Sequence, residues 1–287
     1  MPKGYRATLA VASLLLAIAA LGAVAQEAAV GAEELIARAD AAFDRWTGTF
    51  DFDAYEADLR LAIDLWEEAL PLLAEDRIQS RSRVLNSLSQ ALFELADGYV
   101  IDRGDRETLF ERGKDAALAS LELDPAFVET READGFRAAL LAANDIAAIF
   151  WYGNTLGQWL NYHQWTAVMG GVKDVYASFQ RSIELDETFD AGGPHRAMGS
   201  LLAQAYFTVG RRREDAVAHF ERAIEIDPTH LESYVNYAEH YAKAEKDQVL
   251  LDELLTTVLT LAEDRAVVAA HPFYNARAIE RARRLAR

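Results

Sequence analysis

The chain has no cysteine, and this absence excludes several classes of protein and site. Disulfide-stapled folds, thiolate zinc sites and a lipid-bearing cysteine all require that residue. The six histidines form no H-E-x-x-H pair, and no G-x-S-x-G elbow, phosphate-binding loop or dinucleotide fingerprint occurs. We therefore expect a protein without a metal, without a cofactor and without enzymatic activity.

Basic residues are scarce relative to acidic ones. The chain has 29 Lys and Arg residues and 46 Asp and Glu residues, which gives a formal net charge of −17. Such a surface repels phosphate backbones, so we expect no nucleic acid partner. A basic cluster near the C-terminus comprises Arg281, Arg283, Arg284 and Arg287. These cations either complete the negative end of a last helix, the interpretation that we favour, or contact an acidic partner.

Long apolar runs are missing except at the N-terminus. Lys3 and Arg6 precede an apolar run over residues 7–21, and Ala-Val-Ala at 23–25 forms a small-residue cleavage site. The run is shorter than the roughly 20 residues that a membrane span needs. We therefore expect a cleaved signal peptide over residues 1–25 and a soluble, periplasmic mature protein without a lipid anchor. Cleavage would remove two basic residues and no acidic ones, and the formal charge would become −19.

Apolar residues recur with helical spacing along the rest of the chain, and the alternation typical of strands is absent. Asp53 and Glu56 fit a capping box at the start of a helix that stops near Pro71. Two further helices, over residues 84–99 and 105–123, are expected to form a hairpin. The other predicted helices span residues 130–152, 155–168, 172–185, 195–209, 212–226, 230–245, 248–262 and 272–286. The chain is thus predicted to be all-α.

The segment from Gly193 to Pro228 has the small/large pattern of a tetratricopeptide repeat. Its first helix ends at Gly210, and Pro228 closes the unit because proline cannot donate the hydrogen bond that would continue a helix. The patterned positions are Leu202, Ala203, Tyr206, Ala216, Phe220 and Ala223. Small residues let two helix axes approach closely while aromatic rings fill the space beside them. The segment therefore predicts a packed pair of helices.

Related helix endings occur at 122–125, 184–187 and 225–228. Their spacings of 62 and 41 residues depart from the period of about 34 in a regular array. The repeats are therefore degenerate, and they either carry inserted helices or have diverged into a compact bundle. Because no linker or low-complexity tract follows, residues 26–287 are predicted to form a single TPR-like domain, a bundle or short superhelix of helical hairpins.

An aromatic stretch over residues 144–165 interrupts the repeat pattern and holds three of the five tryptophans. Trp159, Tyr162 and Trp165 follow one another at steps of three, so we expect them on one broad face of a helix. Aromatic planes with polar tips suit an amphipathic or ring-bearing ligand in a cleft. The alternative, which is the commoner use of such a stripe, is that the rings fill the core between two long helices.

Polar residues beside this stretch extend the candidate site. Asp145 falls within an apolar run, and a buried carboxylate needs an arginine, a histidine or a helix start as partner. In the turn Gly-Gly-Pro-His-Arg, Pro194 suits the first helical position and places His195 and Arg196 at a helix N-terminus. These three polar residues either contact a ligand or form ordinary structural pairs, which we favour. The candidate ligand-binding residues are Asp145, Trp151, Trp159, Tyr162, His163, Trp165, His195 and Arg196.

The order of these motifs resembles the T component of tripartite ATP-independent periplasmic (TRAP) transporters over roughly residues 80–285. The motifs that carry the resemblance are WYGN with Trp159 downstream, SFQRSIELD, AGGPHRAMG, HFERAIEIDP and YVNYAEHYA. The resemblance implies a helical bundle with hidden TPR-like repeats that associates with the transporter's periplasmic solute-binding protein. It also implies a small hydrophobic ligand in a cleft or pore, and a homo-oligomer, a trimer. Relatives can be lipoproteins, and the missing cysteine is a departure from them.

These features predict a periplasmic TPR-like accessory protein of a TRAP-type uptake system. It is expected to bind the solute-binding component and a small hydrophobic or organic ligand by recognition alone. The alternative is a general cell-envelope scaffold whose repeat surface binds peptides or assembly factors.

Overall fold

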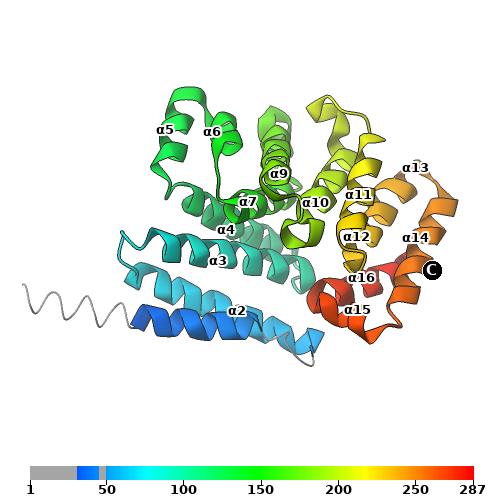
Figure 1. Cartoon of the computed structure of the whole chain (residues 1–287), viewed down its shortest axis with the longest axis horizontal. Coiled ribbons are helices and arrows are strands. Elements are labelled where there is room, and N and C mark those ends of the chain that lie inside the picture. Colours follow the sequence, from blue (N-terminus) through cyan, green and yellow to red (C-terminus); the bar gives the residue numbers. More distant parts are fainter. Residues whose placement is uncertain (1–30, 45–49) are drawn as a thin grey trace, which may run out of the picture.

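The computed structural model describes residues 31–44 and 50–287, and within these ranges every regular element is a helix (Figure 1). The all-α prediction is therefore confirmed. The predicted signal peptide lies outside the described residues. Among the described helices, none combines the length and the apolar character of a membrane span.

The N-terminal part is a stack of long helices. They are the helix over residues 31–43, α2 (Phe52–Ala69), α3 (Ile78–Gly98) and α4 (Arg103–Leu121). α3 and α4 pack on each other as the predicted hairpin. α2 begins after Asp51, whose carboxylate accepts hydrogen bonds from the backbone N–H groups of Asp53 and Ala54 at 3.1 and 3.2 Å. The predicted capping box is therefore wrong, because Asp51 is the cap and Glu56 pairs with Arg60 instead.

The prediction of one continuous helix over residues 130–152 is wrong, because two breaks divide this segment. The segment forms α5 (Pro125–Asp134), α6 (Phe136–Ala142) and α7 (Ile146–Leu160). Gly135, with a φ of 93°, separates α5 from α6. Asp145 lies at the second break and caps α7, since its carboxylate accepts from the Ala148 N–H at 3.0 Å. α4 packs directly on α7, so α5 and α6 form an inserted hairpin that explains the long repeat spacing.

The predicted helix over residues 155–168 is also wrong, because α7 ends at Leu160. A short helix α8 (Gln164–Thr166) and a π-helical turn (Ala167–Gly171) precede α9 (Val172–Asp186). Trp159 therefore lies in the last turn of α7, Tyr162 in the connecting turn and Trp165 in α8. These three aromatic residues do not share one helical face.

The helices α10 (Phe189–Ala205) and α11 (Asp215–Ile226) form the predicted repeat pair. Gly199 of α10 lies against Phe220 of α11 so closely that a Cβ atom at position 199 would be 2.8 Å from the ring. Gly210, with a φ of 69°, ends the first helix after a 3-10 turn, as predicted. The small and large residues thus pack as the repeat pattern requires.

A left-handed turn leads into the regular part of α10. Asp190, Ala191 and Gly192 have φ values of 49°, 53° and 75°. Only glycine adopts this region without cost, so the first two residues are strained. The Arg196 guanidinium holds them in place by donating to the carbonyl oxygens of Asp190 and Ala191, both at 3.3 Å, and to Asp190 Oδ2 at 2.8 Å.

The C-terminal helices return the chain to its beginning. They are α12 (Leu231–Asn236), a π-helical turn (Tyr237–Ala242), α13 (Lys243–Glu245), α14 (Gln248–Leu261), α15 (Arg265–Ala270) and α16 (Pro272–Leu285). The short helix α15 was not predicted from the sequence. In α16, Phe273 stacks on Phe52 of α2 with ring centroids 5.8 Å apart, and Arg277 pairs with Asp97 of α3. Figure 1 shows α15 and α16 beside the ends of α2 and α3. The row of hairpins is therefore closed into a compact bundle.

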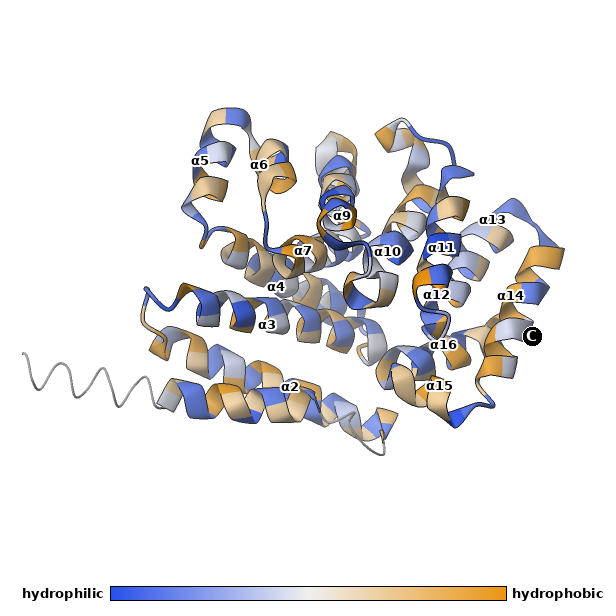
Figure 2. Cartoon of the chain, viewed as in Figure 1, coloured by the Kyte–Doolittle hydropathy of each residue, from blue (hydrophilic) through white to orange (hydrophobic). Residues whose placement is uncertain are grey.

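Two clusters of buried apolar side chains hold this bundle together. One lies between the helix over residues 31–43, α2, α3 and the start of α16. The other centres on α7, which is mostly apolar in Figure 2. Phe93 of α3 and Trp159 of α7 pack against both clusters, so the interior is continuous.

Candidate functional site

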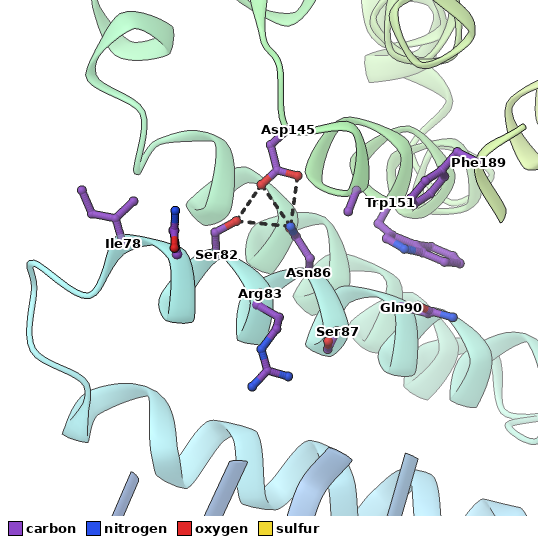
Figure 3. A pocket seen from close by; sticks show the side chains of 11 residues that line it. Ile78, Ser82, Arg83, Asn86, Ser87, Gln90, Asp145, Trp151 and Phe189 are labelled. Atoms are coloured by element: carbon purple, nitrogen blue, oxygen red, sulfur yellow. Dashed lines mark hydrogen bonds between the residues drawn. The ribbon is translucent and has the colours of Figure 1, made fainter. Parts of the chain in front are cut away.

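A pocket of about 520 Å³ lies where α3 faces the first turns of α7 and α10 (Figure 3). α3 supplies a mostly polar wall, whereas α7 and α10 supply aromatic and aliphatic groups. The lining residues are Ile78, Gln79, Ser82, Arg83, Asn86, Ser87, Gln90, Asp145, Ala147, Trp151 and Phe189. Of the eight predicted site residues, the pocket brings together Asp145 and Trp151.

Asp145 fixes the contact between α3 and α7. Besides capping α7, its carboxylate accepts from Ser82 Oγ at 2.6 Å and from Asn86 Nδ2 at 3.1 and 3.2 Å (Figure 3). The prediction that this acid meets a helix start is confirmed, because Asp145 caps the N-terminus of α7. The two α3 partners were not predicted as site residues.

Trp151 lies both in the core and at the pocket. Its ring packs at 5.7 Å from Phe93 and at 5.0 Å from Phe150, and only 4% of the residue is exposed. Phe150 in turn meets Phe189, the pocket residue contributed by α10, at 5.4 Å. Phe93 and Phe150 therefore pack against the aromatic wall of the pocket and fix its position.

The next three predicted residues form a separate cluster between α4 and the end of α7. Trp159 and His163 stack with ring centroids 3.6 Å apart, and Lys114 Nζ lies 4.4 Å from the Trp159 centroid. His163 Nε2 is 2.9 Å from Glu107 Oε1. The Tyr162 ring lies 5.0 Å from the guanidinium of Arg103. All three rings thus have partners on α4 and lie outside the pocket.

Trp165 belongs neither to the pocket lining nor to the cluster of Trp159, Tyr162 and His163. It is 82% exposed, and the neighbouring Val168 and Met169 are 73% and 79% exposed. Arg137 supports the segment by donating to the Gly170 carbonyl oxygen at 3.3 Å and by pairing with Asp174 at 2.7 Å. We call residues 163–171, which carry these three exposed apolar side chains, the exposed apolar segment.

His195 and Arg196 are buried and have protein partners, as the ion-pair interpretation expects. His195 Nδ1 lies 2.9 Å from His219 Nδ1, and its Nε2 lies 3.1 Å from Glu187 Oε2. Burial lowers the pKa of His195, while Arg222 and His195 lower the pKa of Glu187 to about 2. Arg196 therefore stabilises the left-handed turn within the first residues of α10, and His195 stabilises the contact between α10 and α11.

A buried polar cluster at the inner end of α3 was not predicted. Glu94 is fully buried, accepts hydrogen bonds from Gln90 Nε2 at 2.9 Å and from the Tyr274 hydroxyl at 2.7 Å, and lies 3.4 Å from the Tyr55 hydroxyl. Burial raises the pKa of its carboxyl to about 7. The sequence did contain a signal for it, because Ser82, Asn86, Gln90 and Glu94 follow one another at steps of four and form a polar stripe on α3.

The fold and these sites define an all-helical protein of TPR-like hairpins with a pocket and an exposed apolar segment. The family model described as TRAP transporter T-component matches residues 101–287, and the chain therefore belongs to that family. The resemblance stated from the sequence is thereby confirmed. No curated protein matches the chain. Membership gives the protein an accessory role in a TRAP transporter.

Proposed function

We propose that this protein acts in the periplasm and binds the solute-binding component of its TRAP transporter through the exposed apolar segment. The observation that carries the proposal is the exposure of Trp165, Val168 and Met169 within five residues. Apolar surface gains about 25 cal/mol per Å² when it leaves water, so a cluster of this kind is typical of an interface. A transporter component needs such an interface with another component.

The charge pattern supports the same surface. No Asp or Glu occurs between Asp145 and Asp174, although the chain has 46 acidic residues. A carboxylate buried at an interface without a partner is costly, and this segment carries none. Arg137 contacts the end of the segment at the Gly170 carbonyl oxygen and pairs with Asp174 just after it. These contacts restrict the segment before binding, which reduces the conformational entropy lost on binding.

A second part of the proposal concerns a small organic ligand. The pocket between α3 and α7 has a volume within the range of about 300–1,000 Å³ found for small-molecule sites, and it combines aromatic walls with a few polar groups. We propose that it holds the ligand that the accessory protein receives from, or delivers to, its partner. Of the predicted ligand residues, Asp145 and Trp151 serve this pocket, while Trp165 serves docking.

The experiment is a titration of the purified protein with the solute-binding component of the same transporter, by calorimetry. Replacing Trp165 or Met169 by Ser is expected to weaken binding about ten-fold or more, because tryptophan anchors carry much of the binding free energy of such interfaces and methionine is enriched in them. Val249→Ser is the matched control, since Val249 of α14 is 79% exposed and lies outside the segment. Equal affinity of the wild type and the Trp165→Ser variant would refute docking through this surface. A change in self-association without a change in partner binding would also refute it and assign the segment to contacts between copies.

A further inference from the structure

We propose that the docking surface for the solute-binding component extends from the exposed apolar segment across the first turns of α9 to Phe207 and residues 211–213. We further propose that the partner meets this surface with an apolar patch rimmed by carboxylates. Residues 211–213 are all arginine, and we call them the arginine loop. This inference rests on the proposed docking through Trp165, and it adds the second half of the surface and the charge of the partner's face.

The first step is the size of the exposed apolar segment. A stable protein–protein interface of standard size buries about 800 Å² on each partner. Even a large aromatic side chain buries only about 150–250 Å². The exposed side chains of Trp165, Val168 and Met169 therefore supply less area than such an interface needs. The partner must also cover surface next to the segment.

The second step is the surface that lies beside the segment. α9 begins directly after the segment, at Val172, and it packs on α10, the next helix of the chain. The 3-10 turn over Tyr206–Val209, which follows α10, also packs against α9. Arg211, just beyond that turn, donates to the Tyr176 hydroxyl in the second turn of α9 at 2.9 and 3.2 Å. The end of α10 therefore lies beside the start of α9 and next to the exposed apolar segment (Figure 1).

The third step is the apolar character of this second surface. Phe207, in the 3-10 turn, is 72% exposed. Val172 of α9 and Val209 of the turn are half-buried and pack against the core, so apolar surface continues from one side to the other. Protein–protein interfaces are enriched in aromatic residues, methionine and arginine. Trp165, Met169, Phe207 and the arginine loop match that composition.

The fourth step is the charge of the surface. Asp174 is the only acid over residues 146–183, and its carboxylate is paired with Arg137 at 2.7 Å. No acid occurs over residues 191–213. Lys173 and Arg211 are exposed, and neither forms an ion pair in the described part of the chain. A protein with a net charge of −17 therefore presents free cations at this surface, and carboxylates of a partner would pair with them.

The fifth step is a hollow of about 370 Å³ beside the arginine loop. Its lining carries three cations and two acids, and it comprises Tyr206, Arg211, Arg212, Arg213, Glu214 and Glu245. Arg213 is already paired with Glu245 at 2.6 Å. The Arg212 side chain is 78% exposed and has only a 3.4 Å contact with Asp215. A carboxylate side chain of the partner would fit the hollow and pair with Arg211 or Arg212 in the bidentate geometry that guanidinium groups favour.

The test titrates the full-length protein with the purified solute-binding component of its transporter, at about 50 and 500 mM NaCl. Phe207→Ser should weaken binding about ten-fold at both salt concentrations, because it removes an apolar anchor. Arg211→Glu and Lys173→Glu should each weaken binding about five-fold at low salt and much less at high salt, because salt screens exposed charges. The controls are Leu61→Ser, on the exposed side of α2, and Arg265→Glu, at the exposed start of α15.

The outcomes separate this inference from the proposed function on which it rests. Unchanged affinity of Phe207→Ser together with weakened binding by Trp165→Ser would overturn the extended surface and leave docking through the exposed apolar segment intact. Unchanged affinity of both variants would overturn both. Charge reversals that leave the affinity unchanged or tighten binding would overturn the acidic rim assigned to the partner. Charge reversals that weaken only self-association would assign this surface to a second copy of the chain and overturn the inference.

Discussion

The Tyr274 hydroxyl donates a hydrogen bond of 2.7 Å to Glu94 Oε1, across 180 residues of sequence. It joins α16, the last helix, to α3 in the N-terminal layer, and both residues are buried. The neighbouring pair of Arg277 with Asp97 makes the same connection. Together with the stacking of Phe273 on Phe52, these contacts close the row of hairpins into a bundle, and the Tyr274 hydrogen bond fixes the inner end of the α3 stripe.

The first prediction concerns this contact directly. Tyr274→Phe keeps the ring and removes one hydrogen bond to a buried carboxyl, so we expect the free energy of unfolding to fall by about 1–3 kcal/mol. Urea denaturation followed by circular dichroism measures it. Tyr162→Phe is a suitable control, because Tyr162 lies near the surface against Arg103 and outside the cluster. A loss equal in both variants would contradict the special role of the Glu94 contact.

The second prediction concerns pH. Burial raises the pKa of the Glu94 carboxyl to about 7 in the folded protein, from the ordinary glutamate value of 4.5. For an acid with a raised pKa, the stabilising contribution is complete below the unfolded pKa and declines as pH rises toward the folded one. The unfolding free energy should therefore decrease between about pH 4.5 and pH 7, by on the order of 3 kcal/mol from this group. Glu94→Gln should flatten that part of the profile, and an unchanged slope in the variant would show that other groups cause it.

The third prediction concerns the repeat pair. A Cβ atom at position 199 would lie 2.8 Å from the Phe220 ring, which is fully buried. Gly199→Val should therefore push α10 and α11 apart and cost about 1–3 kcal/mol of unfolding free energy, as overpacked cores do. Gly104→Ala is the control, because the new methyl group would meet Asp102 Oδ1 only at 3.4 Å. Thermal unfolding of both variants measures the effect. A Gly199→Val variant as stable as the wild type would contradict the close approach of α10 and α11.

The fourth prediction concerns the strained turn at the start of α10. Arg196 is 5% exposed, donates to two strained carbonyl groups and pairs with Asp190, and its Nε lies 4.0 Å from Glu232 Oε2. Arg196→Met removes the charge but keeps much of the volume, so it leaves two acids without this partner and should cost about 3–5 kcal/mol. Chemical denaturation measures the loss. A loss below about 1 kcal/mol, the range of surface ion pairs, would show that the turn holds without the guanidinium.

Helical periodicity was sufficient to predict the fold class and most helices. Gly210 and the pattern around Phe220 predicted the repeat pair, because helix ends and small/large packing depend on local sequence. The helix breaks at Gly135 and Asp145 were missed, since an apolar run with one acid is compatible with a continuous helix until tertiary contacts are known. The capping error at Asp53 has a similar cause, because several acids near residue 51 could serve as the cap.

The sequence predicted only part of the candidate site, because local sequence does not show which residues of distant helices meet in the fold. Asp145 and Trp151 stand out by chemistry, as an acid and a large ring in an apolar stretch. Their partners on α3 lie about 60 residues earlier, and no local pattern indicates that Ser82 and Asn86 face them. Trp165 was expected to share a face with Trp159, and the turn after Leu160 sends it into solvent instead. The predicted single domain and trimer stay predictions.

We propose above that the exposed apolar segment binds the transporter's solute-binding component. The most direct test of this docking is a photo-cross-linking residue placed at Trp165 in the protein expressed together with its transporter, with the same residue at Val249 as control. We predict a cross-link to the solute-binding component from position 165 and none from position 249. Cross-links from position 165 only to a second copy of the chain, or to no transporter component, would contradict the account.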